Sequence, residues 1–319
     1  MEEKMKDVLQ RIYEIGIVPV IAIDDAKKAV PLAKALVAGG LPAAEVTFRT
    51  AAAEEAIRNI VAEVPEMLVG AGTVLTKEQA DRAIDAGVSF IVSPGFNPEI
   101  TRYVLDKGML MIPGTATPGE MEQAMGMGLS VVKFFPAEQN GGVAKLKALA
   151  GPYTGLRWMP TGGVNEKNLV EYLKFNRIIA CGGTWMVKKD LIEGECWDEI
   201  ERLTREAVKA MLGLRVDHIG INTENEQEAK AAAALFAGMF GLAEKEGNSS
   251  IFMGDNDIEI MKKPYLGKNG HIAIATHTLP RAMAYFKARG FAFREETVTD
   301  KAAYFQDEIA GFALHLVQR

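Results

Sequence analysis

The sequence predicts an α/β fold in two parts: a (β/α)8 barrel over residues 1–213 and a smaller α+β domain over residues 214–319. Two observations carry this prediction. Strand-like and helix-like segments alternate eight times before Gly213, which favours a parallel sheet closed as a TIM barrel. After Gly213 the pattern changes to short strands around single helices, and this second segment repeats itself as two βαβββ modules.

The elements of the barrel follow a regular order. An amphipathic helix is expected over Met5–Ile15, and each later unit begins with an apolar, β-branched run that is typical of a buried strand. A helix capped by Asp24–Asp25 would end at Gly39–Gly40, and the helix Trp197–Leu212 would end the barrel. The predicted strands are Ile17–Ile23, Ala43–Arg49, Met67–Val74, Ser89–Ser93, Leu110–Pro113, Val131–Phe135, Arg157–Thr161 and Ile178–Cys181.

A doubly wound open sheet is the alternative architecture. The count of eight strands disfavours it. So does the first strand, Ile17–Ile23, because no Gly-x-Gly-x-x-Gly turn of the kind that a dinucleotide-binding fold carries comes after it.

Composition excludes several classes of partner. The chain has 319 residues, of which 48% are hydrophobic and 24% charged, and its net charge is -6. Without clustered lysine and arginine we expect no nucleic-acid or membrane partner. The N-terminus lacks the apolar core of a signal peptide, and the two cysteines, Cys181 and Cys196, form no disulfide framework, so we expect a cytoplasmic protein.

One lysine lies inside an apolar run that predicts a buried strand. The segment Val131–Ala137 reads Val-Val-Lys-Phe-Phe-Pro-Ala, so Lys133 has apolar neighbours on both sides. A charged ammonium is costly in such a place, whereas a neutral amine there is the nucleophile that imine formation with a carbonyl substrate requires. A strand-edge lysine that extends its head into water is the alternative.

A carboxylate is expected beside this lysine. In the second strand Glu45, Thr47 and Arg49 follow one another at period two, so all three share one face. Two ionisable groups inside one barrel are more stable together than separately unpaired. We therefore expect Glu45 to lie beside Lys133; a structural ion pair between Glu45 and Arg49 is the alternative.

Glycine pairs follow the last two strands. Barrel enzymes carry their sites in the loops after the strands, and here Gly162–Gly163 follow the seventh strand and Gly182–Gly183 the eighth. Backbone amides without side chains, backed by helix N-termini, form a cradle for an anion. We predict a phosphate site at these loops; glycines that merely permit tight turns are the alternative.

Together these residues resemble one family, the bacterial 2-keto-3-deoxy-6-phosphogluconate (KDPG) and 4-hydroxy-2-oxoglutarate (KHG) aldolases, which are class I lyases on a trimeric barrel. The resemblance spans about residues 5–212. Its motifs are Glu45-Val-Thr-Phe-Arg-Thr50, Val69-Gly-Ala-Gly-Thr-Val-Leu75, Ser93-Pro-Gly95, Val132-Lys-Phe-Phe-Pro-Ala-Glu138, Pro160-Thr-Gly-Gly163 and Gly182-Gly-Thr-Trp185.

The resemblance implies a role for each matching residue. Lys133 would be the Schiff-base lysine and Glu45 the general acid/base. Thr184 stands where the family often has serine, and it keeps the hydroxyl. The residues implied to contact substrate are Arg49, Thr73, Pro94, Phe135, Thr161, Gly162, Gly163, Gly182, Gly183 and Thr184.

The activity that the resemblance implies is aldol cleavage of KDPG to pyruvate and glyceraldehyde 3-phosphate, as in the Entner–Doudoroff pathway, and of KHG to pyruvate and glyoxylate. The lysine imine needs no cofactor, and the protein would be a homotrimer. Two alternatives stay open: a pyruvate-dependent lyase that acts on a non-phosphorylated 2-keto acid, and a barrel that binds a phosphorylated ligand without turnover.

The last hundred residues contain an internal repeat. His218-Ile-Gly-Ile-Asn-Thr223 corresponds to His271-Ile-Ala-Ile-Ala-Thr276, and Asp257-Ile-Glu-Ile-Met261 corresponds to Ala313-Leu-His-Leu-Val317. Paired βαβββ modules resemble the glyoxalase or vicinal oxygen chelate superfamily. That resemblance implies a divalent metal held by His218, Glu259, His271 and His315. A second enzyme, a ligand-sensing module that binds no metal, and an oligomerisation arm are the alternatives.

Overall fold

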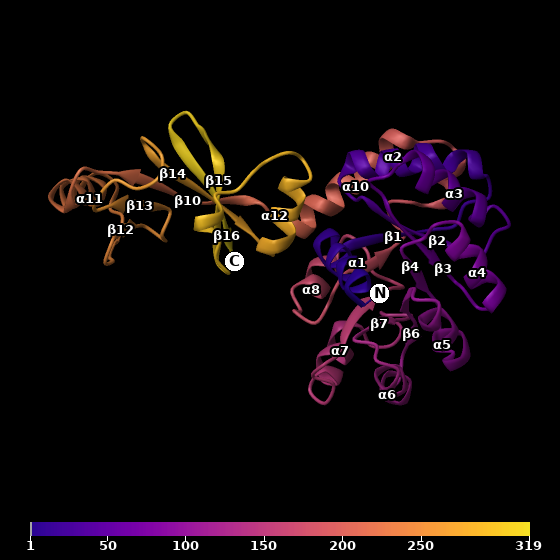
Figure 1. Ribbon diagram of the computed structural model, residues 1–319. Helices are drawn as coiled ribbons and strands as arrows, with labels where there is room; N and C mark the ends of the chain where they lie inside the picture. Colours follow the sequence, from indigo (N-terminus) through magenta and orange to yellow (C-terminus); the bar gives the residue numbers. More distant parts are fainter. Residues whose placement is uncertain (1) are drawn as a thin grey trace. The chain divides into compact units, whose positions relative to one another are not determined.

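The computed structural model describes residues 2–319 (Figure 1). The chain divides into two compact units, Met1–Met211 and Leu212–Arg319. Among the described residues, no helix is both long and apolar enough to span a membrane.

The first unit is a ring of parallel strands. Hydrogen bonds order six of them as β5-β4-β3-β2-β1-β9 and three as β6-β7-β8, and β5 and β6 are two pieces of one strand separated by Pro113. Parallel bridges Trp158↔Ile178 and Thr161↔Gly182 join β8 to the β9 segment and close the ring. The strands are β1 (Ile17–Ile21), β2 (Ala43–Thr47), β3 (Leu68–Gly72), β4 (Phe90–Val92), β5 (Leu110–Ile112), β6 (Gly114–Thr115), β7 (Val131–Phe134), β8 (Arg157–Pro160) and β9 (Cys181–Gly183).

The eighth predicted strand is misplaced in the sequence analysis. It lies at Cys181–Gly183, and Ile178 contributes only an isolated bridge. Glycine usually marks a loop, but here Gly182 pairs with β1 inside the ring. A Cβ on Gly182 would lie 2.3 Å from the Thr161 hydroxyl oxygen, so the strand can approach β8 only because this residue has no side chain.

Helices connect the strands around the ring (Figure 1). The helix predicted from Asp24–Asp25 begins later than expected: Asp25 caps a short 3-10 turn, η1 (Ala26–Lys28), and the α-helix follows with Pro31 in its first turn, where its missing N–H costs nothing. The helices are α1 (Glu2–Ile15), α2 (Ala29–Gly39), α3 (Ala53–Glu63), α4 (Lys77–Asp85), α5 (Pro98–Asp106), α6 (Pro118–Gly126), α7 (Gly142–Ala150), α8 (Leu169–Leu173), α9 (Lys189–Glu193) and α10 (Trp197–Leu212).

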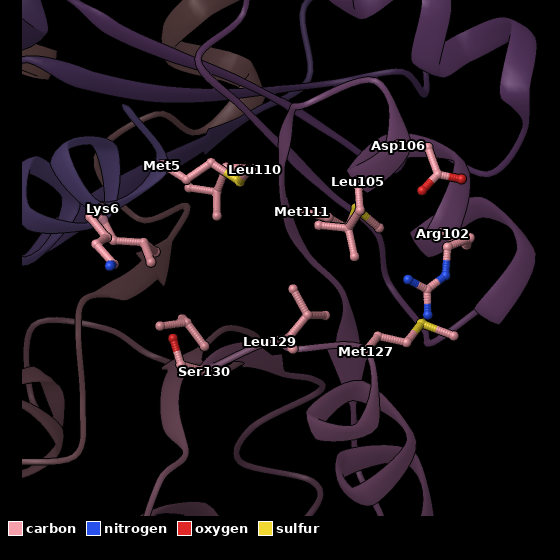
Figure 2. A pocket seen from close by; sticks show the side chains of 13 residues that line it. Met5, Lys6, Arg102, Leu105, Asp106, Leu110, Met111, Met127, Leu129 and Ser130 are labelled. Carbon is pink, nitrogen blue, oxygen red and sulfur yellow. The ribbon is translucent and has the colours of Figure 1, made fainter. Parts of the chain in front are cut away.

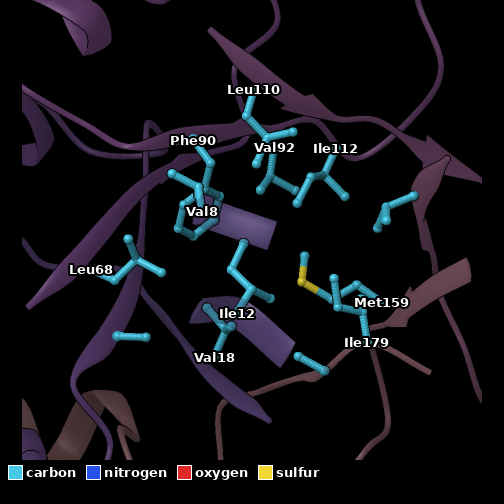
Figure 3. Packing of buried hydrophobic residues seen from close by; sticks show 13 residues of the cluster. Val8, Ile12, Val18, Leu68, Phe90, Val92, Leu110, Ile112, Met159 and Ile179 are labelled. Atoms are coloured by element: carbon cyan, nitrogen blue, oxygen red, sulfur yellow. The ribbon is translucent and has the colours of Figure 1, made fainter. Parts of the chain in front are cut away.

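Helix α1 closes one end of the barrel. Figure 3 shows Val8 and Ile12 packed among inward-facing residues from the strands, such as Val18, Leu68 and Leu110. These apolar side chains fill the end at which the strands begin. The polar residues of the barrel interior are therefore confined to the opposite end, where the strands finish.

The second unit contains one seven-stranded sheet, ordered β11-β12-β13-β10-β14-β16-β15. Its first half has the expected βαβββ order, whereas its second half has one strand fewer, with only an isolated bridge Phe293↔Phe305 at the missing position. The charged stretch Arg294–Glu296 enters a 3-10 turn there, which ends the pairing. The elements are β10 (Arg215–Asn222), α11 (Glu226–Phe240), β11 (Glu244–Glu246), β12 (Ser250–Met253), β13 (Ile258–Met261), β14 (Gly270–Thr276), α12 (Leu279–Lys287), η2 (Glu295–Thr297), β15 (Ala302–Ile309) and β16 (Phe312–Gln318).

Candidate active site

A lysine and a glutamate meet inside the barrel. Lys133 on β7 donates to Glu45 on β2, with 3.2 Å between Nζ and Oε1, and the two side chains are 6% and 1% exposed. Within the described chain, the second carboxylate oxygen of Glu45 is buried without a hydrogen-bond partner. The expected contact between Glu45 and Lys133 is therefore present, and one carboxylate oxygen remains available to a substrate.

Glycines make the space that this pair occupies. Gly72 on β3 lies beside Glu45, and a Cβ added there would come within 2.3 Å of the carboxylate oxygen. Gly114, which pairs with Lys133 in the sheet, sits so close to the Pro94 carbonyl that a Cβ would lie 2.1 Å from its oxygen. Any other residue would displace Glu45 itself at Gly72, or the backbone of Pro94 at Gly114.

One aromatic ring lies beside the amine, and two polar side chains follow Glu45 in the chain. The Lys133 Nζ lies 5.3 Å from the centre of the Phe135 ring, within the range of a cation–π contact. Arg49 lies beyond the end of β2 and its Nε donates to the Thr47 hydroxyl at 3.1 Å, while that hydroxyl donates to the Ile21 carbonyl. Thr47 thus orients Arg49, a role that period-two spacing alone does not reveal.

Thr73 stands at the end of β3 with a φ of 57°, in the left-handed region that a threonine rarely adopts. The strain of such a conformation is tolerated mainly where the surroundings fix it, and such residues cluster at functional sites. Its position beside Gly72 brings it to the same end of the barrel as Glu45.

The residues predicted for phosphate lie on two neighbouring segments. Thr161, Gly162 and Gly163 follow β8, and both glycines have positive φ values, 95° and 83°. The Thr161 hydroxyl is buried and, among the residues described, has no hydrogen-bond partner. An unpartnered hydroxyl beside two glycines of positive φ is suited to an anion.

The second glycine pair differs from the prediction. Gly182 and Gly183 lie within β9 and not in the loop after it, and only Thr184 follows the strand. A Cβ on Gly183 would lie 1.9 Å from the Trp185 ring. Packing thus requires a glycine at this position whether or not an anion binds, so the phosphate role of the pair stays a prediction.

The sequence analysis missed a part-buried contact behind the first glycine pair. The Tyr172 hydroxyl donates to Glu138, and burial together with this bond raises the pKa of Tyr172. The Glu138 backbone N–H donates to the Gly162 carbonyl at 3.1 Å, so the pair fixes the loop after β8. Glu138 lies five residues after Lys133 in the same motif, and this proximity is the feature from which its role could have been predicted.

The second unit brings the four predicted metal-ligand candidates together. His218 Nε2 lies 3.2 Å from His271 Nε2, and Glu259 Oε2 lies 3.3 Å and 3.2 Å from these two atoms. One ring nitrogen from each of His218, His271 and His315 lies within 4.8 Å of the other two, and all three residues are buried. We call His218, Glu259, His271 and His315 the histidine cluster.

Charge is unevenly distributed in the histidine cluster. Burial alone would raise the pKa of Glu259, but hydrogen bonds from His218, His271 and Ser250 hold it below its usual value. Burial, with a smaller contribution from the neighbouring imidazoles, lowers the pKa of His315 to about 3. The cluster thus offers one carboxylate and at least one neutral imidazole near neutral pH.

A separate cavity of about 440 Å³ lies at the other end of the barrel (Figure 2). Its lining includes Met5 on α1, Leu105 on α5 and Met127. Leu110 and Val131, the first residues of β5 and β7, also line it, so it lies at the end where the strands begin. It therefore plays no part in the site that contains Lys133.

The closed parallel barrel and the buried lysine–carboxylate pair near the ends of its strands fit the class of enzymes that act on carbonyl compounds through an amine. Comparison with known families narrows the class. The family model for KDPG and KHG aldolase matches residues 8–203, and the chain belongs to this family.

Individual proteins that are similar to this chain carry names from the same family. A 2-dehydro-3-deoxy-phosphogluconate aldolase of Haemophilus influenzae is 47% identical over 208 residues, which are 65% of this chain and 98% of that protein. The KHG/KDPG aldolase of Escherichia coli K12 is 45% identical over 193 residues, 60% of this chain and 91% of that one. A Legionella pneumophila KDPG aldolase, solved with pyruvate as a covalent carbinolamine, superposes with a TM-score of 0.61 at 36% identity and covers 62% of this chain and 97% of its own.

Proposed function

We propose that the barrel is a class I aldolase that cleaves KDPG to pyruvate and glyceraldehyde 3-phosphate, and KHG to pyruvate and glyoxylate. The observation that carries the proposal is the buried contact of 3.2 Å between Lys133 and Glu45, with the second Glu45 oxygen left without a partner among the described residues. Relatives named for this reaction match almost their whole length to the barrel.

The two side chains supply each proton transfer of the reaction. The Lys133 amine adds to the C2 ketone, and Glu45 protonates the departing oxygen, which leaves as water and gives an imine. The C4 hydroxyl then loses its proton to Glu45, the C3–C4 bond breaks, and its electron pair enters the protonated imine. The aldehyde leaves; the enamine takes a proton at C3, and water releases pyruvate and the free amine.

The proposal assigns the remaining barrel residues to binding. Arg49 and Thr73 would contact the keto-acid carboxylate, and Phe135 and Pro94 would flank the pyruvyl group. The phosphate would lie near Thr161, Gly162, Gly163, Gly182, Gly183 and Thr184. A lyase for non-phosphorylated 2-keto acids is the competing proposal, and it predicts equal efficiency on KDPG and its unphosphorylated analogue.

Reductive trapping tests the imine. Pyruvate and borohydride should add one stable adduct per chain, and mass spectrometry should locate it on Lys133. The Lys133→Met variant should lose both adduct and cleavage, whereas the exposed Lys34→Met variant should keep both. An adduct on another lysine, or cleavage without an adduct, would contradict the mechanism.

The family resemblance also implies a homotrimer in the cytoplasm. Light scattering on the purified protein tests the trimer, and a mass of one or two chains would contradict it.

A second function is proposed for the histidine cluster: binding of one divalent metal ion. Both ring nitrogens of His315 and Nδ1 of His271 are buried without a partner in the part of the chain that the structure describes, so the cluster holds unused electron pairs. Imidazoles with one carboxylate suit Zn, Ni, Fe or Mn better than calcium or magnesium. Bound there, such an ion would act as a Lewis acid toward an oxygen ligand.

Metal analysis tests this second proposal. Protein from cells supplied with these metals should carry about one ion per chain. The double variant His218→Ala, His271→Ala should lose the ion and keep aldolase activity. Stoichiometry near zero in the unaltered protein would leave the second unit a metal-free binding or assembly module.

A further inference from the structure

A carboxylate stands directly behind the histidine cluster. Asp217 Oδ2 lies 2.9 Å from Nδ1 of His218, and the Asp217 side chain is 7% exposed. The Arg319 guanidinium holds this carboxylate from the other side: its Nε donates to Oδ1 at 2.7 Å, and its terminal nitrogen contacts Oδ2. A line of hydrogen bonds thus runs from Arg319 through Asp217 to the ring of His218.

An irregularity in β10 makes this contact available. Consecutive residues of a regular strand face opposite sides of the sheet, so Asp217 and His218 would point apart. The pairing of β10 with β14 shifts register between Val216 and His218, which marks a β-bulge. A bulge re-aims side chains locally, and this one permits two neighbouring residues to meet.

We propose that Asp217, locked by Arg319, is a positioning residue that turns the Nε2 atom of His218 toward the centre of the histidine cluster. The inference rests on the proposed metal function of that cluster. A carboxylate accepts hydrogen bonds and donates none, so it keeps the proton of neutral His218 on Nδ1. In the neutral ring the electron pair is then left on Nε2 for a metal ion; when the ring is protonated, the same atom donates to Glu259 at 3.3 Å.

Among the described residues, hydrogen bonds from outside the histidine cluster orient some of its members and not others. Ser250 donates to Glu259 Oε1 at 2.6 Å, which leaves Oε2 to face the imidazoles. His271 and His315 have no such partner on Nδ1 among the described residues. The two members from the first module are therefore oriented from behind. In the second module, His271 is held by the contact of its Nε2 with Glu259, and His315 stacks on the Tyr304 ring.

Asp217→Asn is the sharpest test because it keeps size and removes one acceptor. Oδ2 faces both His218 and Arg319, whereas Oδ1 faces Arg319 and, at 4.0 Å, Arg215. If the amide nitrogen of asparagine takes the Oδ1 position, it faces the Arg319 guanidinium, which is itself a donor. If it takes the Oδ2 position, it faces both Arg319 and Nδ1 of His218. Changes in partners of this kind cost roughly 10- to 100-fold in metal affinity.

The experiment measures cobalt(II) affinity by competition with a chelator, together with the visible absorption of the bound ion, on the full chain. The exposed Asp307→Asn serves as the matched control. We expect Asp217→Asn to bind cobalt roughly 10- to 100-fold more weakly with an altered spectrum, Arg319→Gln to show a smaller loss, and Asp307→Asn to match the unaltered protein. The thermal midpoint of the metal-free variants separates this effect from simple destabilisation.

Two results overturn the inference. One is unchanged cobalt affinity and spectrum in Asp217→Asn. The other is found by nitrogen NMR of the metal-free protein at alkaline pH, if neutral His218 carries its proton on Nε2. Failure of the unaltered protein to bind any metal would refute the metal function instead; the NMR measurement then still decides whether Asp217 sets the ring of His218.

Discussion

Replacing Glu45 with glutamine separates the chemical role of the carboxylate from its role in the fold. The variant keeps the shape of the side chain and removes the charge that faces Lys133 at 3.2 Å. An ammonium and a carboxylate at that separation would attract by roughly 5 kcal/mol at an effective dielectric constant of about 20, a gross energy that the desolvation of two buried groups offsets in part. The variant removes this attraction for the charged form of the pair.

The same change removes the proton carrier of the proposed mechanism. General acid–base catalysis contributes roughly 10²- to 10⁴-fold, which corresponds to about 3 to 5 kcal/mol in the activation barrier. We therefore expect cleavage to slow by roughly 10²-fold or more. Slow imine formation should persist, because the amine of Lys133 is still present.

The assay compares steady-state cleavage with the rate of borohydride trapping in Glu45→Gln, the unaltered protein and the control Glu63→Gln. Glu63 lies at the exposed end of α3, so its variant should behave like the unaltered protein in both measurements. Normal turnover by Glu45→Gln would refute the acid–base role and make the carboxylate a structural partner of the lysine.

Three further predictions concern other parts of the molecule. Thr161→Val should raise KM for the phosphorylated substrate by roughly 10- to 100-fold, because it removes a buried hydroxyl placed for a charged ligand, while Thr101→Val, another buried threonine, should leave the kinetics unchanged. Burial alone would raise the pKa of Glu120, but hydrogen bonds from Ala116 and Thr117 hold it below 4.5. Glu120→Gln should therefore lower the free energy of unfolding by about 1 kcal/mol above that pH, and the difference should vanish as pH falls through the folded-state pKa; a urea titration series that shows a constant difference would contradict this. Treatment with EDTA should leave cleavage unchanged, since the imine is the electron sink, and a loss of activity would refute the cofactor-free mechanism.

The local sequence pattern was sufficient to predict the positions of most strands in the barrel. The apolar runs predicted where strands lie because a parallel strand is buried on both faces, and the structure trims most of them by one to three residues. Period two placed Glu45 and Thr47 on one face, and the apolar neighbours of Lys133 marked its strand as buried. The helix Trp197–Leu212 has the predicted limits.

The errors have a common cause. Gly182 and Gly183 have the composition of a loop, yet they form a strand because Thr161 and Trp185 press against them from elsewhere in the fold. The missing strand of the second module and the 3-10 turn after Asp25 likewise depend on what the neighbouring segments can pair with. Local composition indicates which secondary structures a segment can form in isolation. Tertiary contacts determine which of these structures it forms in the folded protein.

The sequence by itself determined the barrel and the lysine strand, since each depends on the order and period of nearby residues, whereas the four positions of the histidine cluster were predicted from the resemblance of the repeat to a known superfamily. Only the tertiary structure decided the distances that matter. Lys133 and Glu45 are 88 residues apart and meet because the ring closes with β2 and β7 facing one interior. Asp217 reaches His218 because β10 pairs with β14 through a bulge. Such contacts follow from the register between distant strands, which no local pattern specifies.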